Sequence, residues 1–95
     1  MAAYMIVRVK VTDMARYQEY MKLSPAAIAA AGGRFIVRGG ELATLEGPPE
    51  TARVVIVEFP DLETAKAFYH SELYAAARKV REGAAEAQFV VVAGV

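Results

Sequence analysis

The stretch RVVIVEFPDLETAKAFYHSE, Arg53–Glu72, carries the local signals that decide the fold of this chain. Its first seven residues are rich in β-branched side chains and predict a strand over Arg53–Phe59. Pro60 cannot continue that strand, and Asp61 is a favoured N-cap for the helix that follows. The apolar side chains of this helix recur at helical spacing, at Leu62, Ala65, Phe68 and Tyr69. A strand is therefore expected to pass almost directly into a helix.

The helical pattern is interrupted at His70-Ser71, and the signal for a new helix follows at once. Ser71 followed by Glu72 is typical of a helix N-terminus. The apolar side of this next helix is expected to contain Leu73, Ala77, Val80 and Ala84. Downstream, the run QFVVVA predicts a last strand over Gln88–Ala93.

Upstream, the run YMIVRVKV, Tyr4–Val11, alternates with period two and predicts the first strand. Thr12 or Asp13 then caps a long helix, which ends at the glycine stop signal Gly32–Gly33. Pro25 lies inside this helix and is expected to kink it or divide it into two pieces. The apolar stripe of the helix contains Met14, Tyr17, Tyr20, Met21, Leu23, Ser24, Ala27 and Ile28.

Between the long helix and the central stretch, RFIVR predicts a strand over Arg34–Arg38, closed by a turn or bulge at Gly39–Gly40. A loop rich in Pro and Gly continues to Glu50. The order β-α-β-β-α-β is that of the ferredoxin-like split βαβ arrangement. We therefore predict a single α+β domain over residues 1–95, with a four-stranded antiparallel sheet and the helices on one face.

The two faces of the predicted sheet differ in an informative way. One set of alternate residues is uniformly apolar and is expected to face the helices: Met5, Val7, Val9, Phe35, Val37, Val55, Val57, Phe59, Phe89 and Val91. A solvated opposite face would be mostly polar, yet about half of it is aliphatic: Ile6, Ile36, Val54, Ile56, Val90 and Val92. An exposed apolar patch of this kind marks an interface, so we predict a homodimer in which two sheets pack face to face.

Composition supports this prediction and excludes other classes of protein. Hydrophobic residues make up 56% of the 95 residues, above the roughly 45–50% of typical soluble domains even when glycine is counted as apolar. Eleven basic residues balance eleven acidic ones, so the chain lacks the charge excess of a nucleic-acid-binding protein. Cysteine is absent, which excludes disulfides, thiolate metal sites and cysteine nucleophiles.

The N-terminal run does not have the pattern of a signal peptide, because Arg8 and Lys10 interrupt it and it alternates like a strand. The apolar runs are also far shorter than the roughly 20 residues of a transmembrane helix. We therefore expect a soluble, cytoplasmic protein with neither a membrane nor a nucleic acid as its partner.

Several of these segments together resemble family 1330 of the domains of unknown function. They are GGRFIVRGG (Gly32–Gly40), LEG (Leu45–Gly47), VVIVEFPD (Val54–Asp61), AFYHSELY (Ala67–Tyr74) and the closing VVVAGV. The resemblance implies a dimeric α+β barrel of ferredoxin-like subunits, but no reaction. Other families of dimeric α+β barrels include cofactor-free monooxygenases, small isomerases and haem-degrading enzymes, which is an analogy at the level of fold.

Charged residues interrupt the aliphatic face, and two of them suggest a binding site. Alternation places Arg38 and Glu58 on this face, side by side in a hairpin of the two middle strands. A guanidinium can hold a carboxylate ligand through two parallel hydrogen bonds, and a partly buried glutamate can act as a general base. The alternative is a structural ion pair between the two residues. Arg8 and Arg34 share the face and are expected to be solvated or interface charges.

Apart from these charged residues, the candidates for a functional role are one histidine and several tyrosines. His70 is the sole histidine and lies at the helix break, where it is a candidate acid or base; a surface or helix-end role is the alternative. No acid partner for a triad is apparent, and one histidine is too few for a metal site without carboxylates, so no metal is expected. Tyr4, Tyr20 and Tyr69 could line a pocket with their hydroxyls, although aromatic residues at helical spacing usually belong to the core.

These observations favour a homodimer that binds a small anionic molecule in a pocket at the sheet face, without a cofactor. The expected ligand-binding residues are Arg38, Glu58, Tyr4, Tyr20, Tyr69 and Arg34. One alternative is a cofactor-free isomerase or monooxygenase that uses Glu58 or His70 as its acid or base. Monooxygenases of this fold typically use Asn, Trp or a placed His, and the chain has neither Asn nor Trp. A second alternative is a structural dimerisation module.

Overall fold

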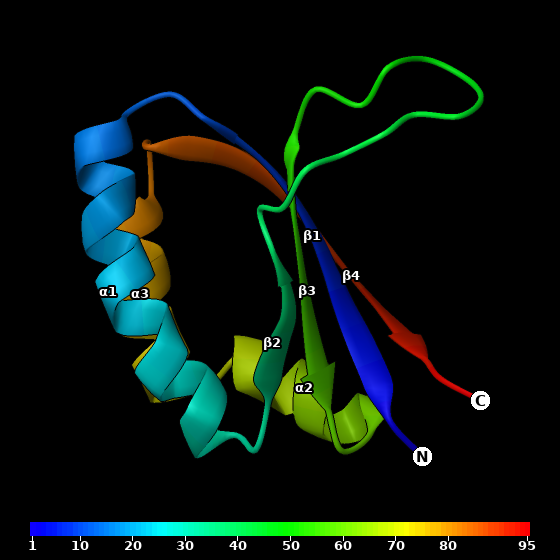
Figure 1. Ribbon diagram of the computed structural model, residues 1–95. Coiled ribbons are helices and arrows are strands. Elements are labelled where there is room, and N and C mark those ends of the chain that lie inside the picture. The colour runs from blue at the N-terminus through cyan, green and yellow to red at the C-terminus, as the bar shows by residue number, and fades with distance from the viewer.

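A computed structural model describes all of residues 1–95. Its seven elements are β1 (Ala3–Val11), α1 (Met14–Ala30), β2 (Arg34–Arg38), β3 (Arg53–Phe59), α2 (Leu62–Tyr69), α3 (Glu72–Arg81) and β4 (Ala85–Ala93). The strands form one sheet in the order β2-β3-β1-β4, and every neighbouring pair is antiparallel. All three helices cover the same face of the sheet (Figure 1). The ferredoxin-like α+β architecture predicted from the sequence is confirmed.

The long first helix is continuous, so of the two expectations for Pro25, a kink or a division, the division is wrong. Its N-terminus is capped by Asp13, whose carboxylate accepts a hydrogen bond from the Arg16 amide at 3.2 Å. Gly32 follows the helix with φ +77°, a backbone conformation that glycine adopts without steric cost. Pro25 lacks an N–H, so the carbonyl four residues earlier, that of Met21, loses its usual helical donor.

The break between α2 and α3 lies where the sequence predicts it, and Ser71 organises it. The Ser71 hydroxyl donates to the Phe68 carbonyl at 2.7 Å and accepts from the Tyr74 amide at 3.3 Å. The α3 helix then buries Tyr74, whereas Leu73, expected on the buried side, is 57% exposed. The buried side of α3 is therefore formed by Tyr74 and Ala77.

The end of α3 also differs from the prediction. The helix ends at Arg81, and Gly83 has φ +79°, so Ala84 lies in a turn and not on the helix. Ala84 is fully buried, and its carbonyl accepts hydrogen bonds from the amides of Thr12 and Asp13. Strand β4 therefore begins at Ala85, three residues earlier than predicted.

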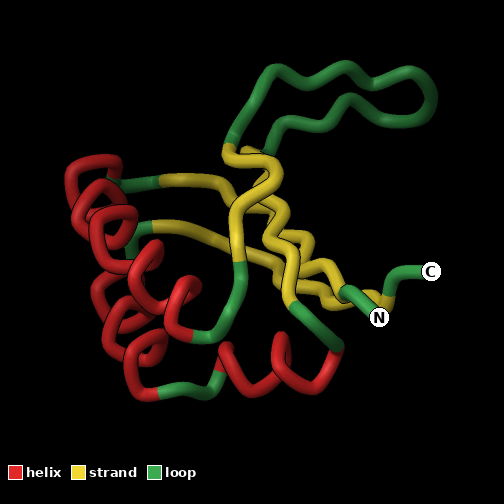
Figure 2. The backbone as a smooth tube through the Cα atoms, turned by 60° about the horizontal axis from the view of Figure 1, so that its bottom comes forward, coloured by secondary structure: helices red, strands yellow, loops and turns green.

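The three helices do not lie at the same distance from the sheet. Helix α2 approaches the strands closely, whereas α1 packs mainly against α3 on the far side of the core (Figures 1 and 2). Large side chains fill the space between the α1–α3 pair and the sheet, and five of them are almost fully buried: Tyr74, Phe59, Phe68, Met5 and Val9. No helix is long and apolar enough to cross a membrane.

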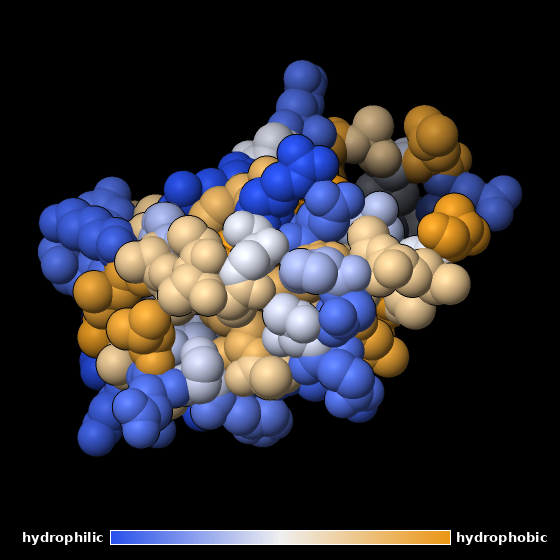
Figure 3. Space-filling model, turned by 90° about the horizontal axis from the view of Figure 1, so that it is seen from below, coloured by the Kyte–Doolittle hydropathy of each residue, from blue (hydrophilic) through white to orange (hydrophobic).

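The opposite side of the sheet, which we call the outer face, has no helix against it. Several of its aliphatic side chains are open to solvent, with Ile36 44% and Val92 48% exposed. Seen from below, hydrophobic groups also reach the surface on the side of the molecule that carries the sheet and the termini (Figure 3). The loop between β2 and β3 extends away from the body and is fixed at its base by Arg8, which bonds both carboxylate oxygens of Glu50.

Candidate functional site

A β-bulge in β2 changes which face of the sheet Arg38 occupies. Phe35 lies opposite Val57 on β3, and after a register shift Arg38 lies opposite Val55. Val55 and Val57 both face the helices, so Arg38 faces them too. The expected position of Arg38 on the outer face is therefore wrong, because strict alternation does not allow for the extra residue of a bulge. The same shift moves Val37 to the outer face, where it lies opposite Ile56.

Arg38 points from β2 toward α1 and is held there by the helix backbone. Its Nη2 donates to the Met21 carbonyl at 3.2 Å, and its guanidinium lies 4.3 Å from the centre of the Phe35 ring. The Met21 carbonyl accepts this bond because Pro25 has no N–H to offer it. The proline thus gives Arg38 a neutral anchor that leaves its positive charge intact.

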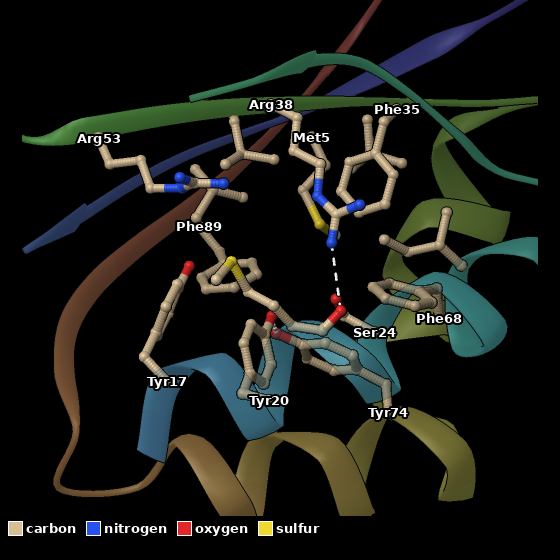
Figure 4. A pocket seen from close by; sticks show the side chains of 15 residues that line it. Met5, Tyr17, Tyr20, Ser24, Phe35, Arg38, Arg53, Phe68, Tyr74 and Phe89 are labelled. Atoms are coloured by element: carbon tan, nitrogen blue, oxygen red, sulfur yellow. Dashed lines mark hydrogen bonds between the residues drawn. The ribbon is translucent and has the colours of Figure 1, made fainter. Parts of the chain in front are cut away.

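Arg53, at the start of β3, lines the same space from the neighbouring strand (Figure 4). Its Nε is buried and has no hydrogen-bond partner. Gly39 makes room for this side chain, because a Cβ at that position would lie 2.6 Å from the Arg53 Cζ. Gly39 also has φ +69°, a backbone conformation that glycine adopts without steric cost.

A pair of tyrosines occupies the helix side of this space. The hydroxyls of Tyr20 on α1 and Tyr74 on α3 are 2.7 Å apart and buried. The Arg81 guanidinium lies over the rings of Tyr20 and Phe89, at 5.4 and 5.0 Å from their centres. Like that of Arg53, the Arg81 Nε is buried without a partner.

These groups surround a small cavity between the sheet and the α1–α3 pair, which we call the inner cavity (Figure 4). Its volume is about 30 Å³, enough for one or two water molecules. Twelve of its fifteen lining residues are hydrophobic, and the other three are Arg38, Arg53 and Ser24. We call the side bounded by Arg38 and Arg53 its mouth, since Arg38 is solvent-exposed.

The inner cavity is electrostatically positive. None of the four ion pairs of the protein involves Arg38, Arg53 or Arg81. Burial raises the pKa of the Tyr17 phenol, and the positive charges of Arg53, Arg81 and Arg38 oppose that rise. Burial likewise raises the pKa values of Tyr20 and Tyr74. At neutral pH these phenols are therefore uncharged hydrogen-bonding groups.

A second cavity, of about 460 Å³ and open to solvent, lies between α2 and β4. It is lined by Met5, Lys66, Tyr69, His70, Arg81, Ala87, Phe89 and Val91, of which Met5 and Phe89 also line the inner cavity. His70 is exposed at the end of α2, and its ring meets the Tyr69 ring edge-on at 5.3 Å. Two of the predicted site residues, Tyr69 and His70, are therefore together here.

The remaining predicted residues lie on the outer face. Glu58 accepts a hydrogen bond from the Arg34 Nε at 2.8 Å, and Tyr4 lies opposite Glu58 in the ladder between β1 and β3. The structure thus separates Arg38 and Tyr20, at the inner cavity, from Glu58, Arg34 and Tyr4. The expected Arg38–Glu58 pair does not form, because the bulge places the two side chains on opposite faces of the sheet.

Arg53, Arg81 and Tyr17 line or border the inner cavity and were not identified from the sequence. Two features of the sequence bear on the mouth of the inner cavity. Pro25 implies an unpaired carbonyl one turn earlier in the helix, and a glycine directly after Arg38 permits a bulged strand end with close contacts. Neither signal identifies Arg53 by itself, because its role depends on the long-range pairing of β3.

No curated protein sequence matched the chain, but solved structures share its fold. A protein of unknown function from Rhodopseudomonas palustris is 20% identical with a TM-score of 0.79, over 99% of this chain and 82% of that one. SnoaB, a cofactor-independent oxygenase from Streptomyces nogalater, is 12% identical with a TM-score of 0.70, over 99% and 93%. A dimeric protein of unknown function from Bacteroides fragilis, with a ferredoxin-like fold, is 21% identical with a TM-score of 0.57, over 98% and 96%.

At these identities the likeness establishes the shared fold alone. The family comparison is more specific, because one model matches residues 2–95, nearly the whole chain. That match agrees with the resemblance seen in GGRFIVRGG, LEG and the other quoted segments. The chain belongs to the family described as domain of unknown function DUF1330.

Proposed function

We propose that this protein binds a small anionic molecule at the inner cavity, between the sheet and the α1–α3 pair. The observation that carries the proposal is that Arg38 and Arg53 both line an apolar cavity and neither is paired with a carboxylate. Arg53 is partly buried, and its buried Nε without a hydrogen-bond partner is costly to maintain. A bound anion would supply the missing partner through charge-assisted hydrogen bonds.

The outer face supports a separate part of the proposal, namely that two copies associate through their sheets. Its aliphatic side chains have no cover within one chain, and its charge Glu58 is already neutralised by Arg34. The Bacteroides fragilis protein of the same fold is described as dimeric. The outer face would then serve assembly, and the inner cavity would serve binding.

A cofactor-free enzyme is the second candidate, and the geometry favours His70 over Glu58 as its acid or base. His70 borders the second cavity, which adjoins the inner one through Met5 and Phe89. Glu58 faces away from both cavities and is held by Arg34. SnoaB, of the same fold, is a cofactor-independent oxygenase. Loss of any turnover in His70→Ala, with turnover kept in Glu58→Gln, would support this candidate.

The binding proposal is tested by thermal-shift measurements with a panel of small anions on wild type, Arg38→Ala and Arg34→Ala. We expect at least one anion to raise the melting temperature of wild type and of Arg34→Ala, because Arg34 lies on the outer face. Arg38→Ala is expected to lose that response. An equal response in all three proteins, or none in wild type, would overturn the proposal.

A further inference from the structure

We infer that the anion is an aromatic carboxylate, with its carboxylate between Arg38 and Arg53 at the mouth and its ring against the aromatic side chains behind them. This inference rests on the proposed function and specifies its ligand. It follows from three properties of the inner cavity, namely the geometry of the mouth, the chemistry of the walls and the means of opening.

The mouth presents two planar, permanently charged donors. A guanidinium matches a carboxylate in shape, because two parallel N–H groups can bond its two oxygens. A hydrogen bond to the Met21 carbonyl holds Arg38 in position. The Arg53 guanidinium lies close to the Gly39 backbone, where a Cβ would otherwise be. The buried, unpartnered Nε of Arg53 is a donor that a ligand oxygen at the mouth would satisfy.

The walls behind the mouth are predominantly aromatic and favour a flat, apolar body. Their rings belong to Tyr17, Tyr20, Phe35, Phe68, Tyr74 and Phe89. These rings already associate with one another at tilted or edge-on angles, for example Phe68 with Tyr74 at 4.5 Å. Such contacts are the ones that another aromatic ring would extend. Inorganic phosphate offers no surface to these walls, and acetate offers a single methyl group.

The cavity must widen to admit a ring, and the residues at its mouth allow this. An apolar cavity of about 150 Å³ accommodates benzene, whereas the space here is about 30 Å³. Met21 is unbranched and flexible, and Arg38 is tied to α1 by one hydrogen bond. We therefore expect the mouth to widen by movement of these two side chains.

The test is an NMR titration of the ¹⁵N-labelled protein with benzoate, benzamide, acetate and inorganic phosphate. We expect benzoate to shift the Arg38 and Arg53 Nε–H signals saturably and to bind at least about tenfold more tightly than benzamide, since a charge-assisted hydrogen bond carries about that factor or more. We also expect it to bind more tightly than acetate and phosphate, since neither has a ring to contact the aromatic walls. Benzamide keeps the ring without the charge, and acetate keeps the charge without the ring.

Each other result overturns the inference in an identifiable way. Equal binding of benzamide would remove the role of the carboxylate, and equal binding of acetate would remove that of the ring. Tighter binding of phosphate or acetate would leave anion binding at the mouth intact and refute only the aromatic class. Absence of saturable shifts with benzoate would refute aromatic carboxylates as the ligand class. The thermal-shift measurements with the panel of small anions would still test the proposed function independently.

Two variants test the assigned position of Arg53. Gly39→Ala places a methyl group against the Arg53 guanidinium, and Gly47→Ala is its matched control, because Gly47 also has a positive φ, +87°, and nothing lies within 4 Å of a Cβ there. Arg53→Lys keeps the charge and removes the planar donor pair, so it remains informative if Gly39→Ala folds poorly. We expect about tenfold weaker benzoate binding in Gly39→Ala and in Arg53→Lys. Unchanged affinity in Arg53→Lys would exclude Arg53 from the site.

Discussion

The arginines on the two faces of the sheet differ in how their charges are balanced. On the outer face, Arg8 is paired with Glu50 at 2.6 Å and Arg34 with Glu58 at 2.8 Å. On the inner face, Arg38 bonds a neutral carbonyl and Arg53 has a buried Nε without a partner. Two arginines of the outer face are therefore paired with carboxylates, whereas the two arginines of β2 and β3 that face the helices are not.

Under the proposed function, this difference would separate assembly from recognition within one small domain. Paired charges among aliphatic side chains suit a surface that is to be covered by another protein surface, because no charge is left to be desolvated alone. Unpaired charges at an apolar cavity suit a ligand that brings its own negative charge.

The largest effect is expected from Ile56→Asp, at the centre of the outer face. An unpaired carboxylate in an apolar interface costs several kcal/mol, so the dimer should weaken by about 100-fold or more. Sedimentation should show wild type at about twice 10.3 kDa and the variant at 10.3 kDa. Leu73→Asp makes the same chemical change at an exposed site on α3 and should remain dimeric. A monomeric wild type would refute the outer-face interface.

The next effect concerns Tyr74→Phe, which removes one member of the buried hydroxyl pair. Tyr20 would keep a buried hydroxyl without its partner, so the free energy of unfolding should fall by about 1–3 kcal/mol. Tyr4→Phe is the matched control on the outer face, where the structure shows no hydrogen bond for the hydroxyl. Urea unfolding of both variants gives the comparison, and an equal small change in both would mean that the pair contributes little.

Removal of arginines should affect stability in opposite directions on the two faces. Arg53→Met removes an unpartnered buried Nε and retains a long apolar side chain, so it should raise the free energy of unfolding by about 0.5–2 kcal/mol. Arg34→Met breaks the ion pair with Glu58 and should lower it by about 0.2–1 kcal/mol. Chemical denaturation measures both. A loss of stability in Arg53→Met would show that Arg53 is a structural residue.

The smallest effect is a pH dependence on the outer side. The hydrogen bond from Arg8 lowers the pKa of Glu50 below its ordinary value of 4.5. The pair therefore stabilises the fold above that ordinary pKa, and the contribution is lost as the pH falls through the lower folded-state pKa. The stability difference between wild type and Glu50→Gln should accordingly be larger at pH 7 than at pH 3. Glu41→Gln, in the exposed loop and in no ion pair, should show no such trend.

Much of the fold could be predicted from the sequence, because local signals and global order agree. Asp61 and Ser71 cap the helices that their positions predict, and the aliphatic outer face is present as expected. The boundary after α3 was misplaced, since Ala84 continues the apolar pattern although Gly83 ends the helix. Periodicity alone does not distinguish a buried turn residue from a buried helical one.

The candidate site was predictable only in part. Arg38 and Tyr20 were identified as ligand-binding candidates, but Arg38 was assigned to the wrong face. A single extra residue in β2 reverses every inward and outward assignment after it, and pattern reading cannot place that residue without the register against β3. Arg53 and Arg81 depend even more on tertiary structure, since one begins a strand and the other lies near the end of a helix.

The proline inside α1 has a consequence for how the cavity would exchange its contents. Because Pro25 has no N–H, the Met21 carbonyl is free to accept a hydrogen bond from the Arg38 guanidinium. This bond holds the Arg38 side chain in place. A ligand would then meet an arginine whose freedom is already restricted, so less conformational entropy is lost when it binds. A residue usually considered a helix defect thus helps to position a side chain of the proposed binding site.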